Sequence, residues 1–450
     1  MKPRPSSPLF DQARSLLLSS TGRNISIVTG GNLINMVLGL LVSIYSLRFL
    51  TSEQIGIVYP LVSFLLLLNQ FSDLGLSMTF LKLGSRVFRS FSSLDTSLKV
   101  DQIALEKNRE YFSNFFWLKL IAGGSVSLLC FLLAAPLAYL VFDSSKYSSY
   151  IRLVSFVSFF QFLAGYFQSS LQVEKKFKAF MFSRLLPQLI KTVGMISIVV
   201  FGFLDLRLAL LFFLQLPVVS CLVAFFFSEK RYISIKPVTN LRVEFFSTSK
   251  WICLSMIANT AMASCDIIMT RSLVGAEELS VYLGGQKLAS ILPILSSSLL
   301  AVLLPKVSSM KNDDEVRFFI RKALRFLPLF SGAILLCLPM SHYVVNLLLG
   351  AKYNSSVNVL NAFLVVHAFG FLITPLGTVL YRMNKERTFA FINIAQLIVN
   401  IFLNWILIPR YGAIGAAGTT LATKVIAGLV IYFVLFQGGY LFSRSEGKKT

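Results

Sequence analysis

Long, almost uninterrupted apolar stretches restrict the fold of this chain more than any other feature. Examples are "VLGLLVSIYSL" within 25–47 and "LLCFLLAAPLAYLVF" within 113–142. About 20 mostly apolar residues are needed for a helix to cross the hydrocarbon layer, and such spans must be helical because lipid offers no partner for open backbone groups. We identify twelve spans: 25–47, 56–80, 113–142, 151–173, 185–203, 208–228, 251–270, 281–304, 326–349, 359–381, 388–408 and 416–437. The sequence therefore predicts an all-α polytopic membrane protein.

The composition supports this class, and the distribution of charge predicts an orientation. Hydrophobic residues make up 55% of the chain and charged residues only 14%, with a mean hydropathy of +0.73, whereas soluble domains carry about 25% charged residues. The net charge is +22. The tails and every second loop hold 31 Lys and Arg residues and the opposite loops hold 7, which predicts that both termini are cytoplasmic. The basic excess thus orients the chain and contacts membrane lipids, and a nucleic-acid partner is not expected.

Motifs for metal, nucleotide or catalytic chemistry are missing from the sequence. The two histidines are isolated, the five cysteines all fall within predicted spans without CxxC spacing, and there is no GxxxxGK[ST] loop. We therefore expect no metal site, no cofactor and no enzymatic activity.

Short polar motifs occur once in each half of the chain. "TSEQIGIVY" (51–59) matches "GAEELSVY" (275–282), "SKYSS" (145–149) matches "AKYNSS" (351–356), and "QVEKK" (172–176) matches "RMNKE" (382–386). The shared order predicts a duplication of six helices, with the two copies running parallel about an axis along the membrane normal. The expected domains are a tail (1–24), an N-lobe (25–228), a linker (229–250), a C-lobe (251–437) and a second tail (438–450).

Polar residues at helical spacing form stripes on several predicted spans. Such a stripe either lines a lumen or bonds neighbouring helices together, and the residues leave both roles open. The number of striped helices favours a lumen. Its candidate substrate-binding residues are Gln161, Gln168, Arg184, Gln188, Lys191, Asn259, Asn393, Asn400 and Lys424.

Six charged residues lie away from the ends of the predicted spans, where a charge needs a partner, a water-filled cavity or a route to the interface. Lys191 and Lys424 are the candidates for contact with an anionic cargo. Asp266 and Lys287 fall at similar depth on consecutive helices, so we expect an ion pair or a coupling role. Asp73 is a further coupling candidate, although packing is the favoured role, and Lys119 is expected to snorkel toward the interface.

The chain resembles the Wzx-type polysaccharide flippases of the superfamily that includes the MATE exporters. The resemblance covers about 25–437 and rests on "RFLTSEQIGIVYPLV", "FSDLGLSMTFLKLGSR" and "IPRYGAIGAAGTTLATKVI", together with the segment 266–308. It implies a MATE-like fold of two six-helix lobes in the bacterial plasma membrane. The implied activity is transfer of undecaprenyl-diphosphate-linked oligosaccharides to the outer leaflet, by alternating access, for surface polysaccharides such as O-antigen or capsule. A polymerase and a chain-length regulator are the implied partners.

Two other functions remain open. A MATE-like antiporter of small molecules and ions would use the same fold, but four intramembrane lysines against two aspartates favour an anionic cargo. A membrane polysaccharide polymerase or glycosyltransferase is disfavoured because the predicted external loops are short and lack clustered carboxylates.

Overall fold

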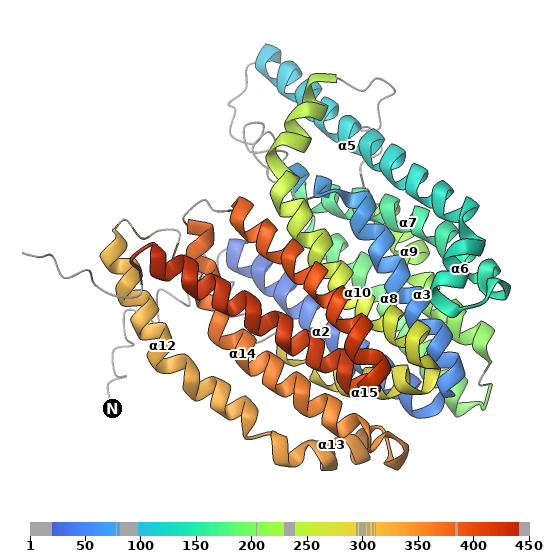
Figure 1. Ribbon diagram of the computed structural model, residues 1–450. Coiled ribbons are helices and arrows are strands. Elements are labelled where there is room, and N and C mark those ends of the chain that lie inside the picture. Colours follow the sequence, from blue (N-terminus) through green and yellow to red (C-terminus); the bar gives the residue numbers. More distant parts are fainter. Residues whose placement is uncertain are drawn as a thin grey trace, which may run out of the picture. The chain divides into compact units, whose positions relative to one another are not determined.

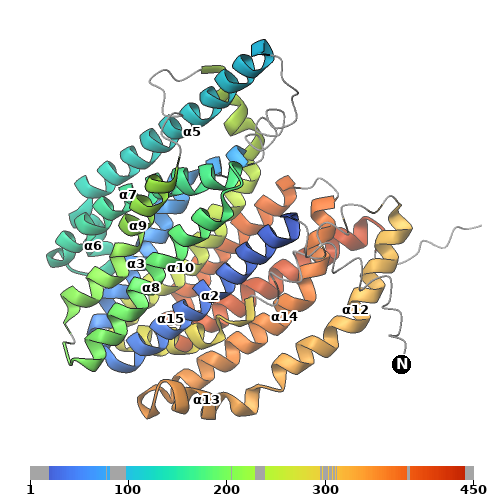
Figure 2. The ribbon, with the colours of Figure 1, turned by 180° about the vertical axis from the view of Figure 1, so that it is seen from behind.

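A computed structural model of the chain describes residues 20–77, 79–81, 98–203, 205–228, 239–293, 296, 303, 307, 310, 312–382 and 386–440. Within these residues the regular structure is helical and includes no β-strand. Figures 1 and 2 show the long helices and their short connections from opposite sides. The all-α fold class predicted from the apolar stretches is confirmed.

The helices follow the predicted order along the chain. The first half contains α2 (Ser20–Phe49), α3 (Ser52–Asp73), α5 (Leu98–Leu132), α6 (Ala134–Phe142), the 3₁₀-helix η1 (Ser145–Tyr147), α7 (Ser148–Val173), α8 (Phe177–Val200) and α9 (Leu206–Phe227). The second half contains α10 (Thr239–Ala289), α12 (Asp313–Leu335), η3 (Leu338–Met340), α13 (Ser341–Leu348), η4 (Ala351–Tyr353), α14 (Ser356–Arg382) and α15 (Glu386–Gln437).

Ten stretches of the described helices are long and apolar enough to cross a membrane. In two of them the backbone leaves the helical conformation inside one continuous element, at Gly275 within α10 and at Gly412 within α15. A hydrogen bond from Gln396 to the carbonyl of Thr423 joins the two arms of α15, so this element is a hairpin. Each of the twelve predicted spans overlaps one of these helices or arms.

Two helices begin earlier than the predicted spans. Residues 98–112 were expected in a loop, but α5 begins at Leu98, and α12 likewise begins at Asp313 within the expected loop 305–325. Asp313, Asp314 and Glu315 occupy the first turn of α12, where acidic groups stabilise the helix N-terminus. A helix can therefore continue beyond the apolar stretch that identifies its membrane-crossing part.

Prolines mark two of the interruptions. Pro136 lies near the start of α6, just after the break at Leu133, and Pro339 lies in η3 between α12 and α13. Pro187 and Pro375 are inside α8 and α14. Because proline cannot donate the hydrogen bond of a helix interior, it is tolerated at such ends and otherwise weakens the helix locally.

By its internal contacts the chain divides into two compact units. The first comprises Met1–Val42, Leu76–Leu129 and Ser155–Thr248. Its helices approach closely at glycines: a Cβ added at Gly194 of α8 would stand 2.2 Å from the ring of Phe212 of α9. Small residues permit this close packing where lipid gives helices no hydrophobic reason to associate.

The second unit comprises Ser43–Gly75, Cys130–Val154 and Ser249–Thr450. Part of its core is formed by buried side chains of α12, α14 and α15, among them Val316, Ile320, Val379, Ile392 and Leu435. The predicted boundaries of the N-lobe and the C-lobe stay a prediction.

The repeated motif has a structural role in the second unit. In the first copy Thr51 caps α3: its Oγ1 accepts from the N–H of Gln54 at 3.2 Å, and the Gln54 side chain accepts from the N–H of Thr51 at 3.0 Å. The copies also touch, since a Cβ at Gly56 would stand 2.5 Å from the Cβ of Ala276. Each copy thus starts a helix, and the two starts are packed together.

Candidate functional site

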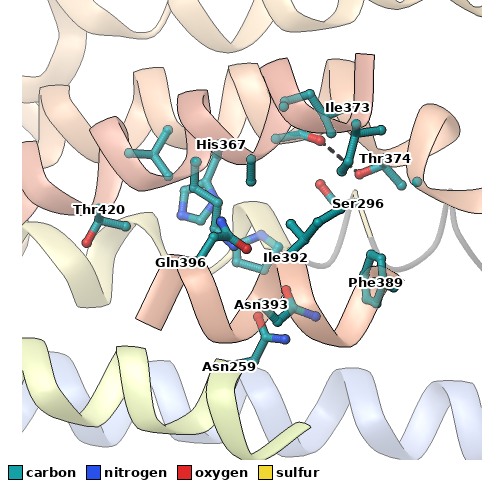
Figure 3. Close-up of a pocket in the computed structure, with 18 of the residues that line it drawn as sticks. Asn259, Ser296, His367, Ile373, Thr374, Phe389, Ile392, Asn393, Gln396 and Thr420 are labelled. Carbon is teal, nitrogen blue, oxygen red and sulfur yellow. Dashed lines mark hydrogen bonds between the residues drawn. The ribbon is translucent and has the colours of Figure 1, made fainter. Parts of the chain in front are cut away.

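A cavity of about 480 Å³ lies inside the second unit. Its walls come from α10, α14 and both arms of α15, and Pro293 and Ser296 also line it; Figure 3 shows Ser296 beside the α14 and α15 residues. Its polar residues are Asn259, Ser296, His367, Thr374, Asn393, Gln396, Thr420 and Lys424, and the remaining wall is apolar.

Two basic side chains line this cavity. Lys424 lies on the second arm of α15 and His367 on α14. Within the described part of the chain, neither the Lys424 amino group nor a His367 ring nitrogen has a protein hydrogen-bond partner. The ammonium group offers three donors and the imidazole at least one. Acceptors for these donors must therefore come from the cavity itself.

The amides of the cavity are held in place by hydrogen bonds within and between α10 and α15. Asn393 donates to the hydroxyl of Ser255, Asn259 donates to the carbonyl of Ser255 at 2.9 Å, and Gln396 donates to the carbonyl of Thr423 at 3.1 Å. Each of these bonds uses only the amide nitrogen. The predicted stripe on the first arm of α15 thus contributes both to helix packing and to the cavity wall.

Asp266 of α10 accepts four hydrogen bonds beside this cavity. Asn400 and Asn404 donate to Oδ1 at 3.0 and 2.6 Å, while Thr420 and Tyr282 donate to Oδ2 at 2.8 and 3.2 Å. All four donors are neutral, and they come from both arms of α15 and from the second arm of α10. A buried carboxylate needs such donors because its desolvation is expensive. The cluster therefore fixes α10 against α15.

The predicted ion pair between Asp266 and Lys287 is not formed. The Lys287 amino group instead lies over the ring of Tyr59, 5.4 Å from its centroid. The donors around Asp266 satisfy its carboxylate without a cation within ion-pair distance. Tyr282, which sequence reasoning missed as a site residue, is the final residue of the second motif copy. The final residue of the first copy, Tyr59, bonds to Ser46 at 2.8 Å. His367 was also missed, and no pattern in the sequence distinguished it.

The candidates in the first unit lie on α7 and α8. Arg184 donates to the side-chain oxygen of Asn32 at 3.0 Å, and the Lys191 amino group lies 4.0 Å from the ring centroid of Phe213. Gln188 lies between them on α8, and its buried side-chain nitrogen has no acceptor among the described residues. Gln161 and Gln168 are half-buried on α7. Arg184 thus contacts α2 and Lys191 contacts α9, and a shared face toward one lumen stays a prediction.

Lys119 and Asp73 occupy different surroundings. Lys119 is only 2% exposed, and a Cβ at Gly165 of α7 would stand 3.1 Å from its amino nitrogen. The expectation that Lys119 snorkels is therefore wrong, because its amino group is enclosed between α5 and α7. Asp73 is half-buried at the end of α3, where the chain turns through left-handed Leu74 and Gly75. In the described residues no three His, Cys, Asp or Glu side chains are grouped to hold a metal ion.

The end of α2 is held by η4 in the same unit. The Tyr353 hydroxyl donates to the carbonyl of Leu47 at 2.7 Å, and the Lys352 amino group donates to the carbonyl of Arg48 at 2.8 Å. The last carbonyls of a helix have no partner within it, so both bonds cap α2. Burial raises the pKa of Tyr353 and lowers that of Lys352. We call this arrangement the Lys–Tyr clasp.

Comparison with known proteins gives the family. The sequence model of the family described as polysaccharide biosynthesis protein matches residues 47–358. The chain belongs to this family. A putative O-antigen transporter of Shigella flexneri is 25% identical over 37% of the chain and 40% of its own length. The capsular polysaccharide biosynthesis protein CapF of Staphylococcus aureus is 24% identical over 52% of the chain and 61% of its own length. The match thus spans less than two thirds of each relative.

Solved structures show that this polysaccharide biosynthesis family member has a transporter fold. The lipid II flippase MurJ, in an inward closed conformation, superposes with a TM-score of 0.72 at 15% identity, over 92% of this chain and 89% of MurJ. A multidrug resistance MATE family transporter, in an inward-facing conformation, superposes with a TM-score of 0.68 at 14% identity, over 90% and 95%. The predicted MATE-like fold of a multi-pass membrane protein is confirmed.

Proposed function

We propose that this family member is a flippase for lipid-linked oligosaccharides. Its cargo is an undecaprenyl-diphosphate-bound repeat unit, which it carries from the cytoplasmic to the outer leaflet for a surface polysaccharide. The family match and the two relatives, which are named for O-antigen transport and capsule synthesis, support the substrate class. The fold, shared with a lipid II flippase and a MATE transporter, supports transport by alternating access.

The observation that carries the proposal is the cationic cavity of the second unit. A diphosphate passing the low-dielectric core needs positive charge, and Lys424 supplies it: among the described residues its amino group has no hydrogen-bond acceptor. The amide oxygens of Asn259 and Asn393 and the hydroxyl of Ser296 line the same space. Sugars bind through such amides and hydroxyls, so one cavity combines groups for both parts of the headgroup.

The stripe of α8 is proposed as a second contact region. Arg184, Gln188 and Lys191 place two cations and an amide on one face of the helix. Gln161 and Gln168 of α7 and Asn400 of α15 complete the set of candidates, although Asn400 acts through Asp266. In this mechanism no covalent chemistry occurs on the chain.

The setting of the protein follows from its charge distribution. We place it in the bacterial plasma membrane with both termini in the cytoplasm, because the basic loops lie on one side of the predicted spans. A polymerase and a chain-length regulator are the partners that would consume the flipped unit.

Complementation tests the proposal. The chain is expressed in a strain that lacks its own flippase, with matching glycosyltransferases, and surface polysaccharide is measured beside protein level. We expect the wild type to restore the polymer, and Lys424→Glu and Lys191→Glu to abolish it at near-normal protein level. Lys424→Arg should be milder because it keeps the charge with a different shape. Lys322→Glu, at an exposed position of α12, is the matched control and should remain active. Full activity of both Lys424→Glu and Lys191→Glu would contradict the proposed role of positive charge in transport.

A second candidate function, an ion-coupled antiporter, is favoured by one observation. Asp266 is a buried carboxylate beside the cavity, and the side-chain oxygen of its neighbour Asn404 has no hydrogen-bond donor among the described residues. A carboxylate with spare oxygen acceptors nearby is suited to exchange a proton or a small cation. Drug susceptibility of an efflux-deficient strain distinguishes the functions: resistance conferred by the wild type, without restored polysaccharide in the complementation assay, would select the antiporter.

A further inference from the structure

A basic pocket of about 330 Å³ lies in the first unit, away from the cavity described above. It is formed by the start of α2 and the turn between α7 and α8. Its lining includes Arg23, Asn24, Lys175, Lys176, Phe177 and Lys178. The turn belongs to the motif "QVEKK", whose counterpart "RMNKE" lies largely outside the described residues. The transport mechanism proposed above makes no use of this pocket.

Positive charge in the pocket exceeds the negative charge around it. Lys176 pairs with Glu174 at 2.7 Å, and the Glu174 side chain is only 3% exposed. Among the described residues no carboxylate forms an ion pair with Arg23, Lys175 or Lys178. Like charges that converge without counter-charges repel one another. The pocket is therefore electrostatically suited to an anion.

The first turn of α8 adds backbone donors to the same pocket. Phe177, Lys178 and Ala179 line it, and their N–H groups precede the first helical hydrogen bond, which runs from Phe180 to the carbonyl of Lys176. The side chain of Lys176, at the N-cap, does not satisfy them. Free N–H groups at a helix N-terminus bind phosphate and similar oxyanions well. The chain thus directs backbone donors and cationic side chains into one space.

Lys175 holds an unusual backbone conformation at this position. Its φ is +58°, in the left-handed region, and the N–H groups of Lys175 and Lys176 bond back to the carbonyls of Gln172 and Leu171 at 3.1 and 2.8 Å. This is a helix C-terminal turn in which glycine is the usual residue. A lysine there is strained, and strain of this kind accumulates at functional sites. The lysine gives the pocket a cation that glycine would not.

We infer that the pocket binds a phosphate or diphosphate group carried by a lipid. The membrane-crossing part of α7 ends at Val173 and that of α8 begins at Phe177, so the pocket lies at the level of the lipid headgroups. Basic pockets between membrane helices on the cytoplasmic side are suited to anionic headgroups. Bulk anionic phospholipid and the diphosphate of a prenyl-linked cargo are two sources of the same chemistry. Binding of the former does not depend on the proposed function, whereas binding of the latter rests on it.

The first experiment measures binding by the purified full-length protein. The probes are neutral phosphatidylcholine nanodiscs containing increasing phosphatidylglycerol, and farnesyl diphosphate added to neutral nanodiscs, with the thermal midpoint as the readout. We expect at least one probe to raise the midpoint, and the double variant Arg23→Gln/Lys178→Gln to need at least about tenfold more probe. The stronger probe identifies the source. The control Arg321→Gln/Lys322→Gln removes the same charge from exposed positions of α12 and should respond as the wild type does.

The second experiment separates binding from folding. Lys175→Gly removes a cation and also relieves left-handed strain, so it should leave the ligand-free midpoint unchanged or higher while weakening the response to the probe. Asp143→Gly is the matched control, because Asp143 also has a positive φ, +55°, but lies outside the pocket. No response of the wild type to either probe would overturn the inference, as would an undiminished response of both pocket variants. Restored polysaccharide by the wild type, scored separately, shows whether the proposed transport function stands.

Discussion

Asp266 shows how a carboxylate can be buried in a membrane helix without a salt bridge. Four neutral side chains supply its hydrogen bonds, and burial of a carboxylate without such partners would be very costly. Its spacing from Lys287 suggested a pair, but spacing along two helices does not fix which way each side chain points. The stripe of asparagines on α15 was visible in the sequence. The sequence did not show that two of these residues, Asn400 and Asn404, would donate hydrogen bonds to Asp266.

We expect Asp266→Asn to destabilise the protein. An asparagine presents N–H donors to a site built of donors, so about one buried hydrogen bond is lost and another group is left unsatisfied. The expected loss is about 1–3 kcal/mol in the free energy of unfolding, measured as a lower thermal midpoint in detergent. Asp143→Asn changes the same chemical group at an exposed turn and should have little effect, since asparagine tolerates a positive φ. Equal midpoints of Asp266→Asn and the wild type would contradict the role given to this cluster.

The ends of the helices in this fold depend on a few turns as much as on the apolar stretches. Each of the twelve spans predicted from the apolar stretches overlaps a helix or helix arm. This is because a helix that crosses a membrane must be apolar over its whole crossing length. They did not show that α5 begins at Leu98 or that α12 begins at Asp313, because those first turns are charged and lie beyond the apolar part. The sequence also did not show what contacts the turn at Gly412. In the structure the Glu278 carboxylate accepts a hydrogen bond from the N–H of the next residue, Ala413, at 2.6 Å.

Gly412 should not accept a side chain. Its φ is +57°, and a Cβ there would stand 2.3 Å from the Glu278 carboxylate that holds the next residue. Gly412→Ala should therefore lower the free energy of unfolding by about 1–3 kcal/mol, through backbone strain and loss of the contact. The control is Gly418→Ala on the second arm of α15, where nothing lies within 4 Å of an added Cβ. A thermal midpoint of Gly412→Ala at or above that of Gly418→Ala would show that the turn is not strained.

The two copies of the Lys-Tyr motif differ in their contacts. Tyr353 and Lys352 of η4 form the Lys–Tyr clasp with α2. Tyr147 of η1 instead forms ring contacts with Phe142, Tyr150 and Lys146, and its hydroxyl has no hydrogen bond among the described residues. Since the motif is duplicated, Tyr147 is a natural control for Tyr353.

Tyr353→Phe should loosen the end of α2. The variant keeps the ring and removes the hydroxyl that donates to Leu47, which leaves that carbonyl without its cap. A single cysteine at Ser46, a residue buried at the same end of α2, should then react several times faster with a membrane-impermeant thiol reagent added outside cells. Tyr147→Phe should leave the rate unchanged. If the cysteine reacts at the same rate in Tyr353→Phe and Tyr147→Phe, the Lys–Tyr clasp does not stabilise the end of α2.

At the scale of the whole molecule, the charge of the loops predicts the orientation in the membrane. The fold could be predicted from hydrophobicity, the repeats and the family resemblance, because these depend on patterns spread over many residues. The candidate site could be predicted only in part. Lys424, Asn259 and Asn393 were identified and line one cavity, whereas His367 was missed because an isolated histidine carries no spacing signal. The pairing of Asp266 and the burial of Lys119 depend on side-chain directions that one sequence does not determine.

Cysteine labelling tests the orientation. In a cysteine-free background, cysteines at Ser145 and Asn354, both exposed in the connections η1 and after η4, should react with an impermeant reagent added to intact cells. Cysteines at Lys178 and Lys322, also exposed but on the basic side, should react only after lysis. Labelling of the second pair in intact cells would reverse the orientation, and with it the side on which the basic pocket lies.

The Lys–Tyr clasp also has a consequence for sequence change over time. Both of its acceptors on α2 are main-chain carbonyls, those of Leu47 and Arg48, which every amino acid carries. Substitutions at these two positions can therefore accumulate without breaking the bonds, as long as the helix is kept. The donors have no such freedom, because only a hydroxyl and an amine of suitable reach can replace them. Relatives that keep this contact should vary at the end of α2 while retaining a Lys-Tyr pair, or chemically similar donors, in the connection before α14.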